Sequence, residues 1–273
     1  MIMNSTDNIL ISVILGTVVV GYYSNYVTVF SMIDKVVMIV ISAILASIGN
    51  FIATQSPDRS FSLFRYLLFY FYALAAFCSS CYLCGMDDFI TIWIGEEFVI
   101  SGGFIFALVF NRYVFFIVHP VWITRESSGV FVSTRYVMLC AAIINIVLSV
   151  FLGRVWGVSG IIAATGLSYL LTIFWYEPKK LCEIVFQTSV TNYWKYIAKL
   201  MIPTVPVFVT AAALRVWSTT NLVPLLIKFI LCFITTVFWF YILFRKSDEI
   251  RWGLKIITST KLYSVFMSRR ASE

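Results

Sequence analysis

The chain has 273 residues, of which 61% are hydrophobic and only 12% charged, and its mean hydropathy is +0.94. An ordinary soluble domain carries about a quarter charged residues, so this composition excludes a soluble globular protein. The net charge of +7 does not indicate nucleic-acid binding, because excess Lys and Arg in a membrane protein usually mark loops retained in the cytoplasm. We therefore expect an all-α membrane protein, a multi-span helical bundle with no nucleic-acid partner.

Residues 1–244 are predicted to form about eight transmembrane helices, because a spanning helix needs about 20 mostly apolar residues. Turn-forming residues separate the apolar runs, as at Ser56-Pro57-Asp58 and Trp156-Gly157-Val158-Ser159-Gly160. Residues 245–273 are predicted to form a basic, amphipathic cytoplasmic tail. In chain order, the candidate spans are Ile2–Val20, Val27–Phe51, Phe61–Cys84, Phe98–Trp122, Tyr136–Leu152, Val158–Trp175, Ile197–Val216 and Leu222–Phe244.

The basic residues of the predicted loops are divided unevenly between the two sides of the bundle. Fifteen of them fall on the side that carries both termini, and this side is predicted to be cytoplasmic. The opposite side holds three basic residues and an acidic connection, and we expect it to be extracytoplasmic. Its charged residues are Arg154, Arg215, Lys228, Asp87, Asp88, Glu96 and Glu97.

Four charged residues, Asp7, Asp34, Lys35 and Arg112, lie within or near the middle of candidate spans. A charge there costs roughly 3 kcal/mol or more, so each should face the bundle interior or an aqueous cavity. Asp34 and Lys35 are adjacent and point about 100° apart on a helix, so each is expected to pair with another helix. Arg112 has the planar, bidentate fork that suits a phosphate group, although an interhelical structural pair explains it equally well.

Asn111 and His119 are weaker candidates in the same helix as Arg112. Amide side chains often join membrane helices without touching a substrate. His119 is the only histidine, so it forms no metal site or catalytic triad, but its charge changes near neutral pH and it is a candidate for proton coupling. The six Cys lie mostly in apolar runs, where Cys packs as a small buried residue. We therefore expect no metal, no cofactor and no enzymatic activity.

Several short segments occur in a particular order along most of the chain. They are Thr6-Asp7-Asn8-Ile9-Leu10-Ile11-Ser12, Leu15-Gly16, Val20-Gly21-Tyr22-Tyr23-Ser24-Asn25-Tyr26, Ser47-Ile48-Gly49-Asn50, Ile92-Trp93-Ile94-Gly95, Gly129-Val130-Phe131, Ile144-Asn145-Ile146-Val147-Leu148-Ser149, Trp156-Gly157-Val158-Ser159-Gly160, Ala164-Thr165-Gly166-Leu167-Ser168 and Phe174-Trp175-Tyr176-Glu177-Pro178. In this order and spacing, the chain resembles the C-terminal half of bacterial polysaccharide flippases of the Wzx type. These flippases belong to the multidrug/oligosaccharidyl-lipid/polysaccharide export superfamily.

The resemblance implies a multi-pass protein of the bacterial cytoplasmic (inner) membrane that works by alternating access. Its substrate would be an undecaprenyl-pyrophosphate-linked oligosaccharide, moved from the cytoplasmic to the outer leaflet and coupled to an ion or proton gradient. Arg112, Lys35 and Asn111 are the candidates for substrate binding in the cavity. Asp7, Asp34 and His119 are the candidates for coupling. Membrane lipids and other polysaccharide-assembly proteins are the expected partners.

Flippases of this family have two lobes, and the resemblance begins in the middle of the helix that opens the second lobe. Three explanations stay open: a gene fragment, a mis-set start codon, or a half-transporter that takes its N-terminal lobe from another chain. Two other functions also stay open, namely an inactive flippase remnant and a membrane enzyme of capsule or O-antigen synthesis, such as a polymerase or acyltransferase. Short outer connections and a lone His argue against the enzyme.

Overall fold

The computed structural model describes residues 2–100 and 103–259, which contain helices and no strand, and side chains are described for residues 7–39, 41–42, 45–100 and 103–253. Residues 260–273, the second half of the predicted tail, lie outside the described residues. Two short 3-10 helices are η1 (Glu96–Phe98) and η2 (Val132–Thr134). The α-helices are α1 (Ile2–Leu15), α2 (Thr17–Thr54), α3 (Pro57–Ile94), α4 (Phe104–Ser128), α5 (Val137–Leu171), α6 (Ile173–Ile184), α7 (Val190–Arg215), α8 (Leu222–Phe244) and α9 (Asp248–Ser259).

Five helical segments of the described chain are long and apolar enough to cross a membrane. They agree with a multi-pass helical membrane protein, whereas the predicted number of eight spans stays a prediction. The five segments are Pro57–Ile94, Phe104–Ser128, Val132–Ile184, Val190–Arg215 and Leu222–Phe244.

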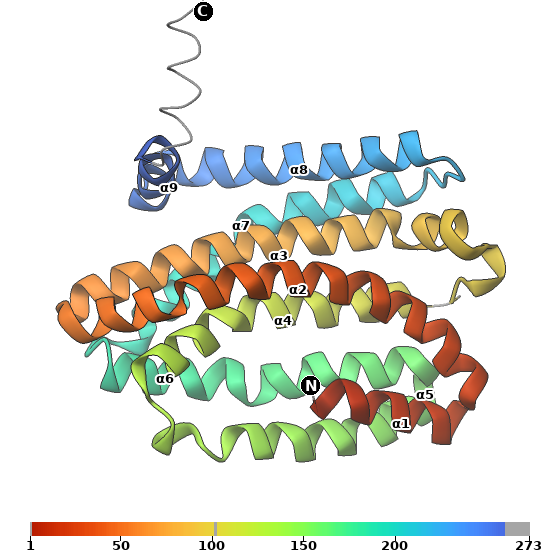
Figure 1. Cartoon of the computed structure of the whole chain (residues 1–273), viewed down its shortest axis with the longest axis horizontal. Helices are drawn as coiled ribbons and strands as arrows, with labels where there is room; N and C mark the ends of the chain where they lie inside the picture. The colour runs from red at the N-terminus through yellow and green to blue at the C-terminus, as the bar shows by residue number, and fades with distance from the viewer. Residues whose placement is uncertain (1, 101–102, 260–273) are drawn as a thin grey trace, which may run out of the picture.

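The segment Val132–Ile184 contains a reversal of the chain inside α5. Gly157 has φ 61° and ψ −138°, a backbone conformation that a residue with a Cβ rarely adopts. The two halves of α5 then pack so closely that a Cβ on Gly160 would lie 2.1 Å from the carbonyl oxygen of Leu152. The turn predicted at Trp156–Gly160 is therefore present as a tight helical hairpin (Figure 1).

The first two helices differ from the predicted boundaries. A break at Gly16, with φ 94°, ends α1 inside the expected span Ile2–Val20, and α2 then continues from Thr17 through the expected loop. That loop is helical because Tyr23 and Tyr26 are buried and pack edge-on against Phe104 of α4. Packing of these aromatic rings thus stabilises a helical conformation in the segment between the two predicted spans.

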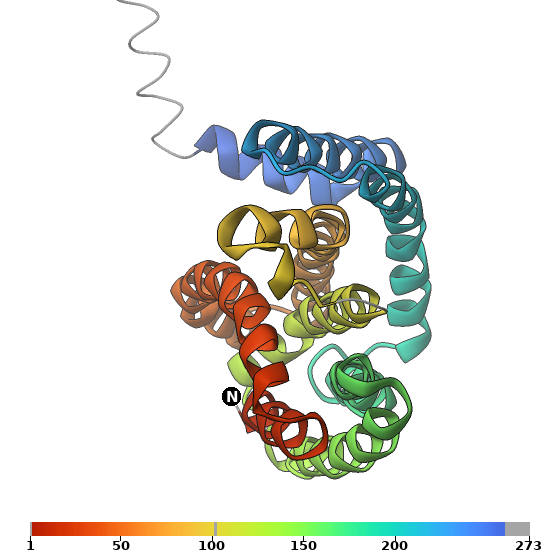
Figure 2. The ribbon, with the colours of Figure 1, turned by 90° about the vertical axis from the view of Figure 1, so that its right-hand side faces the viewer.

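Helices α3 and α4 form the central pair of the bundle. α3 packs against α2, α4, α7 and α8, while α4 packs against α2, α3, α5 and α6. α1 packs on α5 at one edge, and α8 with α9 lies at the opposite edge (Figures 1 and 2). This order places α2 and α4 in direct contact.

Interhelical ion pairs lie at both ends of the bundle, and each joins two residues that the sequence assigns to the same side. Charges on the described residues are therefore grouped as the loop pattern predicts, while the end that faces the cytoplasm stays a prediction. The pairs are Arg65–Glu249 and Arg125–Glu177 at the basic end, and Arg215–Asp87 and Lys228–Asp88 at the other.

Candidate functional site

A buried ion pair joins the middle of α2 to the middle of α4. Arg112 Nη1 donates to Asp34 Oδ2 over 2.7 Å, and Arg112 is only 4% exposed. The guanidinium also lies between two aromatic rings, with Cζ 4.4 Å from the centroid of Phe30 and 4.6 Å from that of Phe115. Aromatic faces stabilise a cation, so the site holds the guanidinium in one orientation. Asp34 thus pairs with another helix, as its sequence context predicts.

Asn111 connects this pair to α5. Its Nδ2 donates to the backbone carbonyl oxygen of Ile162 over 2.9 Å, and its Oδ1 lies 3.5 Å from Arg112 Nη2. The amide therefore joins two helices and borders the guanidinium at the same time.

Two atoms of the ion pair keep free hydrogen-bonding capacity. Arg112 Nε and Asp34 Oδ1 are buried and have no hydrogen-bond partner among the described residues. A buried donor or acceptor without a partner destabilises the fold by about 1–3 kcal/mol. A ligand that accepts from Arg112 Nε would satisfy part of this deficit.

Asp7 of α1 lies in a separate polar chain against α5. The hydroxyl of Thr165 donates to the Asp7 carboxylate, 3.2 Å from Oδ2, and accepts from Asn145 Nδ2 at 2.9 Å. Asp7 is 1% exposed, and no Lys or Arg of the described residues lies within ion-pair distance of it.

Asn145 and Thr165 were not predicted as site residues. Their sequence signal is the placement of polar side chains within two apolar runs, and both belong to segments of the family resemblance. The hairpin at Gly157 brings them together across 20 positions of sequence.

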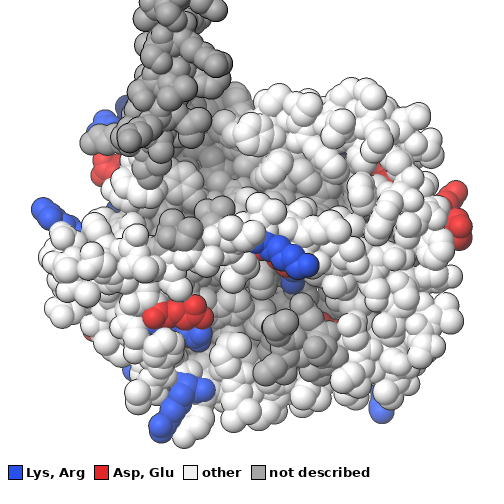
Figure 3. All heavy atoms as spheres, viewed as in Figure 1, with Lys and Arg blue, Asp and Glu red and all other residues white. Residues whose placement is uncertain are grey.

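Lys35, next to Asp34 on α2, is exposed and makes no ion pair with any described residue. It belongs to a stripe of polar residues whose spacing of 4, 3, 4 and 7 positions keeps them on one face of a helix with 3.6 residues per turn. We define the polar stripe of α2 as Ser24, Thr28, Ser31, Lys35 and Ser42. α2 crosses the face drawn in Figure 3, where charged groups are sparse and a basic group stands near the centre.

His119 lies on α4, two turns after Arg112, and does not join the network around Arg112. Its Nδ1 contacts the backbone oxygen of Phe115, its Nε2 lies 3.2 Å from Met38 Sδ, and its ring stacks on Phe71. Within the described part of the chain, no set of three His, Cys, Asp or Glu side chains is arranged to hold a metal ion. The structure therefore brings Arg112, Asp34 and Asn111 together and leaves His119, Lys35 and Asp7 out of direct contact with them.

No family model, no curated protein and no solved structure matches the chain.

Proposed function

We propose that this chain is one lobe of an exporter that moves a lipid-linked oligosaccharide across the bacterial cytoplasmic membrane by alternating access. The observation that carries the proposal is the polar stripe of α2, with the Arg112–Asp34 ion pair directly beside it. A polar face on an intramembrane helix is unfavourable against lipid and therefore favours contact with a hydrated passage.

The stripe has the chemistry to contact sugars. Its hydroxyl protons are donated to backbone carbonyls one turn earlier, as in Ser24 to Val20 at 2.7 Å and Thr28 to Ser24 at 2.9 Å. The hydroxyl oxygens therefore remain free to accept hydrogen bonds from sugar hydroxyl groups. From Ser24 to Ser42 the stripe rises about 27 Å, close to the thickness of the hydrocarbon core.

Arg112 supplies the pyrophosphate site in this proposal, and Asp34 occupies that site when substrate is absent. An incoming phosphate offers oxygen atoms to both Nη groups and to Nε, so it competes with Asp34 for the guanidinium. Lys35, exposed on the same helix, adds a second positive charge near the passage. Asn111 holds the guanidinium of Arg112 against α5 while the phosphate replaces Asp34.

When the phosphate displaces Asp34 from Arg112, the Asp34 carboxylate is left in the bilayer without its partner. This unpaired carboxylate couples substrate binding to the uptake of an ion. Such a carboxylate must take up a proton or a cation, because an unpaired charge there is unfavourable. Asp7, with the hydroxyl of Thr165 beside it and no ion-pair partner in the described chain, is a second site for the same uptake. In this mechanism, substrate binding at Arg112 and uptake of the coupling ion at Asp34 act on the same ion pair, while Asp7 lies in a separate polar chain.

Binding of an undecaprenyl-pyrophosphate-linked oligosaccharide to the full chain in detergent, followed by native mass spectrometry, tests the proposal. We expect Arg112→Ala to weaken binding at least tenfold. Asp34→Asn should strengthen binding, because it removes the competitor for Arg112 and keeps the side-chain shape. Arg154→Ala is the matched control, since Arg154 is an exposed basic residue that takes no part in the Arg112–Asp34 pair.

The alternative of an inactive remnant treats Arg112–Asp34 as a structural pair alone. It predicts that Asp34→Asn lowers stability and leaves pyrophosphate binding no stronger than in the wild type. That result, or unchanged binding by Arg112→Ala, would remove the assignment of Arg112. Transport itself is then measured with an N-terminal lobe co-expressed, by appearance of surface polysaccharide in a strain that lacks its flippase.

A further inference from the structure

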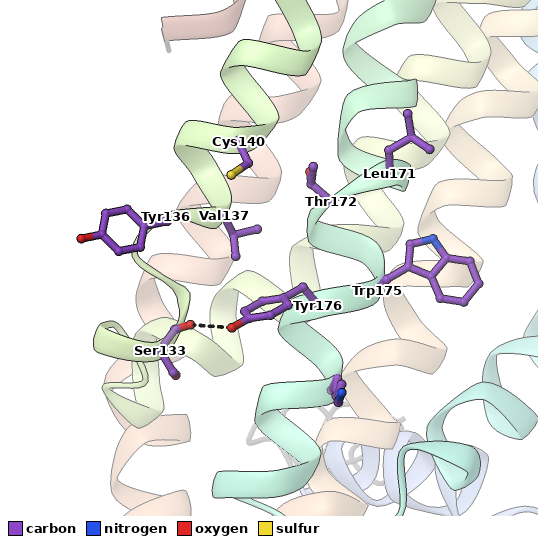
Figure 4. A pocket seen from close by; sticks show the side chains of 9 residues that line it. Ser133, Tyr136, Val137, Cys140, Leu171, Thr172, Trp175 and Tyr176 are labelled. Carbon is purple, nitrogen blue, oxygen red and sulfur yellow. Dashed lines mark hydrogen bonds between the residues drawn. The ribbon is translucent and has the colours of Figure 1, made fainter.

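A groove opens between the two halves of the α5 hairpin at the basic end of the bundle. Its cavity volume is about 560 Å³, within the range of about 300–1,000 Å³ that is typical of small-molecule sites. One wall comes from η2 and the start of α5, and the other from the end of α5 and from α6 (Figure 4). The lining residues are Ser133, Tyr136, Val137, Cys140, Leu171, Thr172, Trp175, Tyr176 and Lys179.

The groove follows from the geometry of the hairpin. Near the turn, the glycines bring the two halves of α5 into close contact, with Gly160 against Leu152. Toward the other end the first half carries Tyr136, Val137 and Cys140. Figure 4 shows Val137 and Tyr176 pointing toward each other from opposite walls. The hydroxyl of Tyr176 donates to the carbonyl oxygen of Ser133 over 3.3 Å and ties the walls together at this end.

The end of the groove carries positive charge. Lys179 lines it, is 58% exposed at its side chain and lies 4.0 Å from its nearest acidic partner, Glu183. Glu183 is engaged more closely by Lys180, at 2.7 Å. The Arg135 guanidinium stacks on the ring of Tyr136, a lining residue, and makes no ion pair with any described acidic residue. The mouth of the groove therefore holds more positive than negative charge.

The remaining lining residues suit the boundary of a bilayer. Tyr136, Trp175 and Tyr176 are all exposed, and such aromatic side chains concentrate at the level of the lipid head groups. Val137, Cys140 and Leu171 continue the wall with apolar surface suited to a hydrocarbon chain.

We propose that this groove is a binding site for an anionic phospholipid of the surrounding bilayer. Its phosphate lies at Lys179 and Arg135, and one acyl chain lies along Val137, Cys140 and Leu171. Charge complementarity selects this occupant, because basic pockets between membrane helices bind anionic head groups. A second copy of the chain would bring the same positive groove edge and would be repelled at this contact. The proposal depends on membrane embedding and not on flippase activity.

The test is native mass spectrometry of the full chain in detergent, titrated with phosphatidylglycerol or with phosphatidylcholine of the same acyl chains. We expect phosphatidylglycerol to bind at least tenfold more tightly. The double variant Arg135→Ala/Lys179→Ala should weaken its binding about 25-fold, because each basic residue near an anionic lipid contributes about fivefold. Binding of phosphatidylcholine should change little.

The matched control is Lys199→Ala/Arg245→Ala, which removes two exposed charges from the same end of the bundle. Neither residue lines the groove, and Lys199 lies against the ring of Phe244. A third variant, Val137→Trp, fills the groove without changing charge and should weaken binding of both lipids.

Three results would overturn the proposal. The first is equal affinity for the two lipids. The second is an equal loss in the control and groove variants, which would indicate only a basic surface. The third is a dimer that Val137→Trp dissociates, which would assign the groove to a second copy.

Discussion

Lys228 of α8 donates to Asp88 Oδ2 of α3 over 2.6 Å, and the Lys228 side chain is completely buried. Its Nζ also donates to the backbone carbonyl oxygen of Cys84 over 3.3 Å. A buried ammonium group is stable only when acceptors replace the water it has lost. Asp88 and Cys84 therefore fix the position of α8 against α3.

Lys228→Met should destabilise the protein by about 3–5 kcal/mol, because it leaves the Asp88 carboxylate without its partner. The double variant Lys228→Met/Asp88→Asn should recover much of this loss, since neither side chain then carries a charge. Thermal unfolding in a mild detergent measures both. Lys199→Met, at an exposed basic position, is the control and should shift the unfolding temperature little.

Gly160→Ala should destabilise the hairpin by about 1–3 kcal/mol, because the new Cβ would collide with a backbone carbonyl that has little freedom to move. Gly21→Ala is the matched control, since a Cβ at this helical position meets nothing within 4 Å. There the substitution should be neutral or slightly stabilising. Equal unfolding temperatures for the two variants would contradict the close approach of the two halves of α5.

Glu249→Gln should loosen α9. The Glu249 carboxylate accepts from Arg65 Nη2 at 2.7 Å and from the hydroxyl of Tyr196 at 2.8 Å, and the side chain is buried. We expect faster hydrogen exchange of residues 248–253 in this variant. Asp248→Asn, at an exposed residue of the same helix, should leave the exchange rate unchanged.

The contacts of Glu249 also predict that hydrogen exchange of α9 depends on pH. Burial alone raises the pKa of Glu249, but hydrogen bonds to its carboxylate and the charge of Arg65 hold the pKa below its ordinary value. A depressed pKa means that this stabilisation is complete above the unfolded value of about 4.3 and is lost as the pH falls through the folded value. Exchange of α9, corrected for the intrinsic rate, should therefore rise only below about pH 4. A rise between pH 5 and pH 7 would point to another group.

Single cysteines test the predicted orientation in the membrane. In a Cys140→Ser background, Arg154→Cys should react with an impermeant maleimide added to intact cells, and Lys179→Cys should react only after lysis. Both positions are exposed and lie in segments assigned to opposite sides. The reverse labelling pattern would indicate the opposite orientation in the membrane for the same fold.

The parts of the fold that the sequence predicts are those where one property dominates. Long apolar runs locate α3, α4, α7 and α8, and the glycine at 157 locates the hairpin, because only glycine adopts its backbone conformation without strain. The loop expected near Tyr23 was wrong, since burial of aromatic rings against Phe104 decided its conformation.

The sequence predicts which charged residues belong to the candidate site. It does not predict which residues they contact. Asp34 and Arg112 are visible as charges in apolar runs, but their pairing depends on α2 and α4 lying side by side, which no local pattern encodes. The chain from Asp7 to Thr165 and Asn145 likewise requires the hairpin and the docking of α1. The groove at Lys179 arises from the separation of two helices and has no sequence signal of its own.

The ion pairs of α3 also constrain how the protein is made. Asp87 and Asp88 are synthesised 128 and 140 residues before Arg215 and Lys228. At about 5–20 residues per second, the ribosome takes roughly 7–28 s to reach the second partner. During that interval two carboxylates near the end of α3 lack their basic partners. We therefore expect these two ion pairs to form only after α7 and α8 have been synthesised.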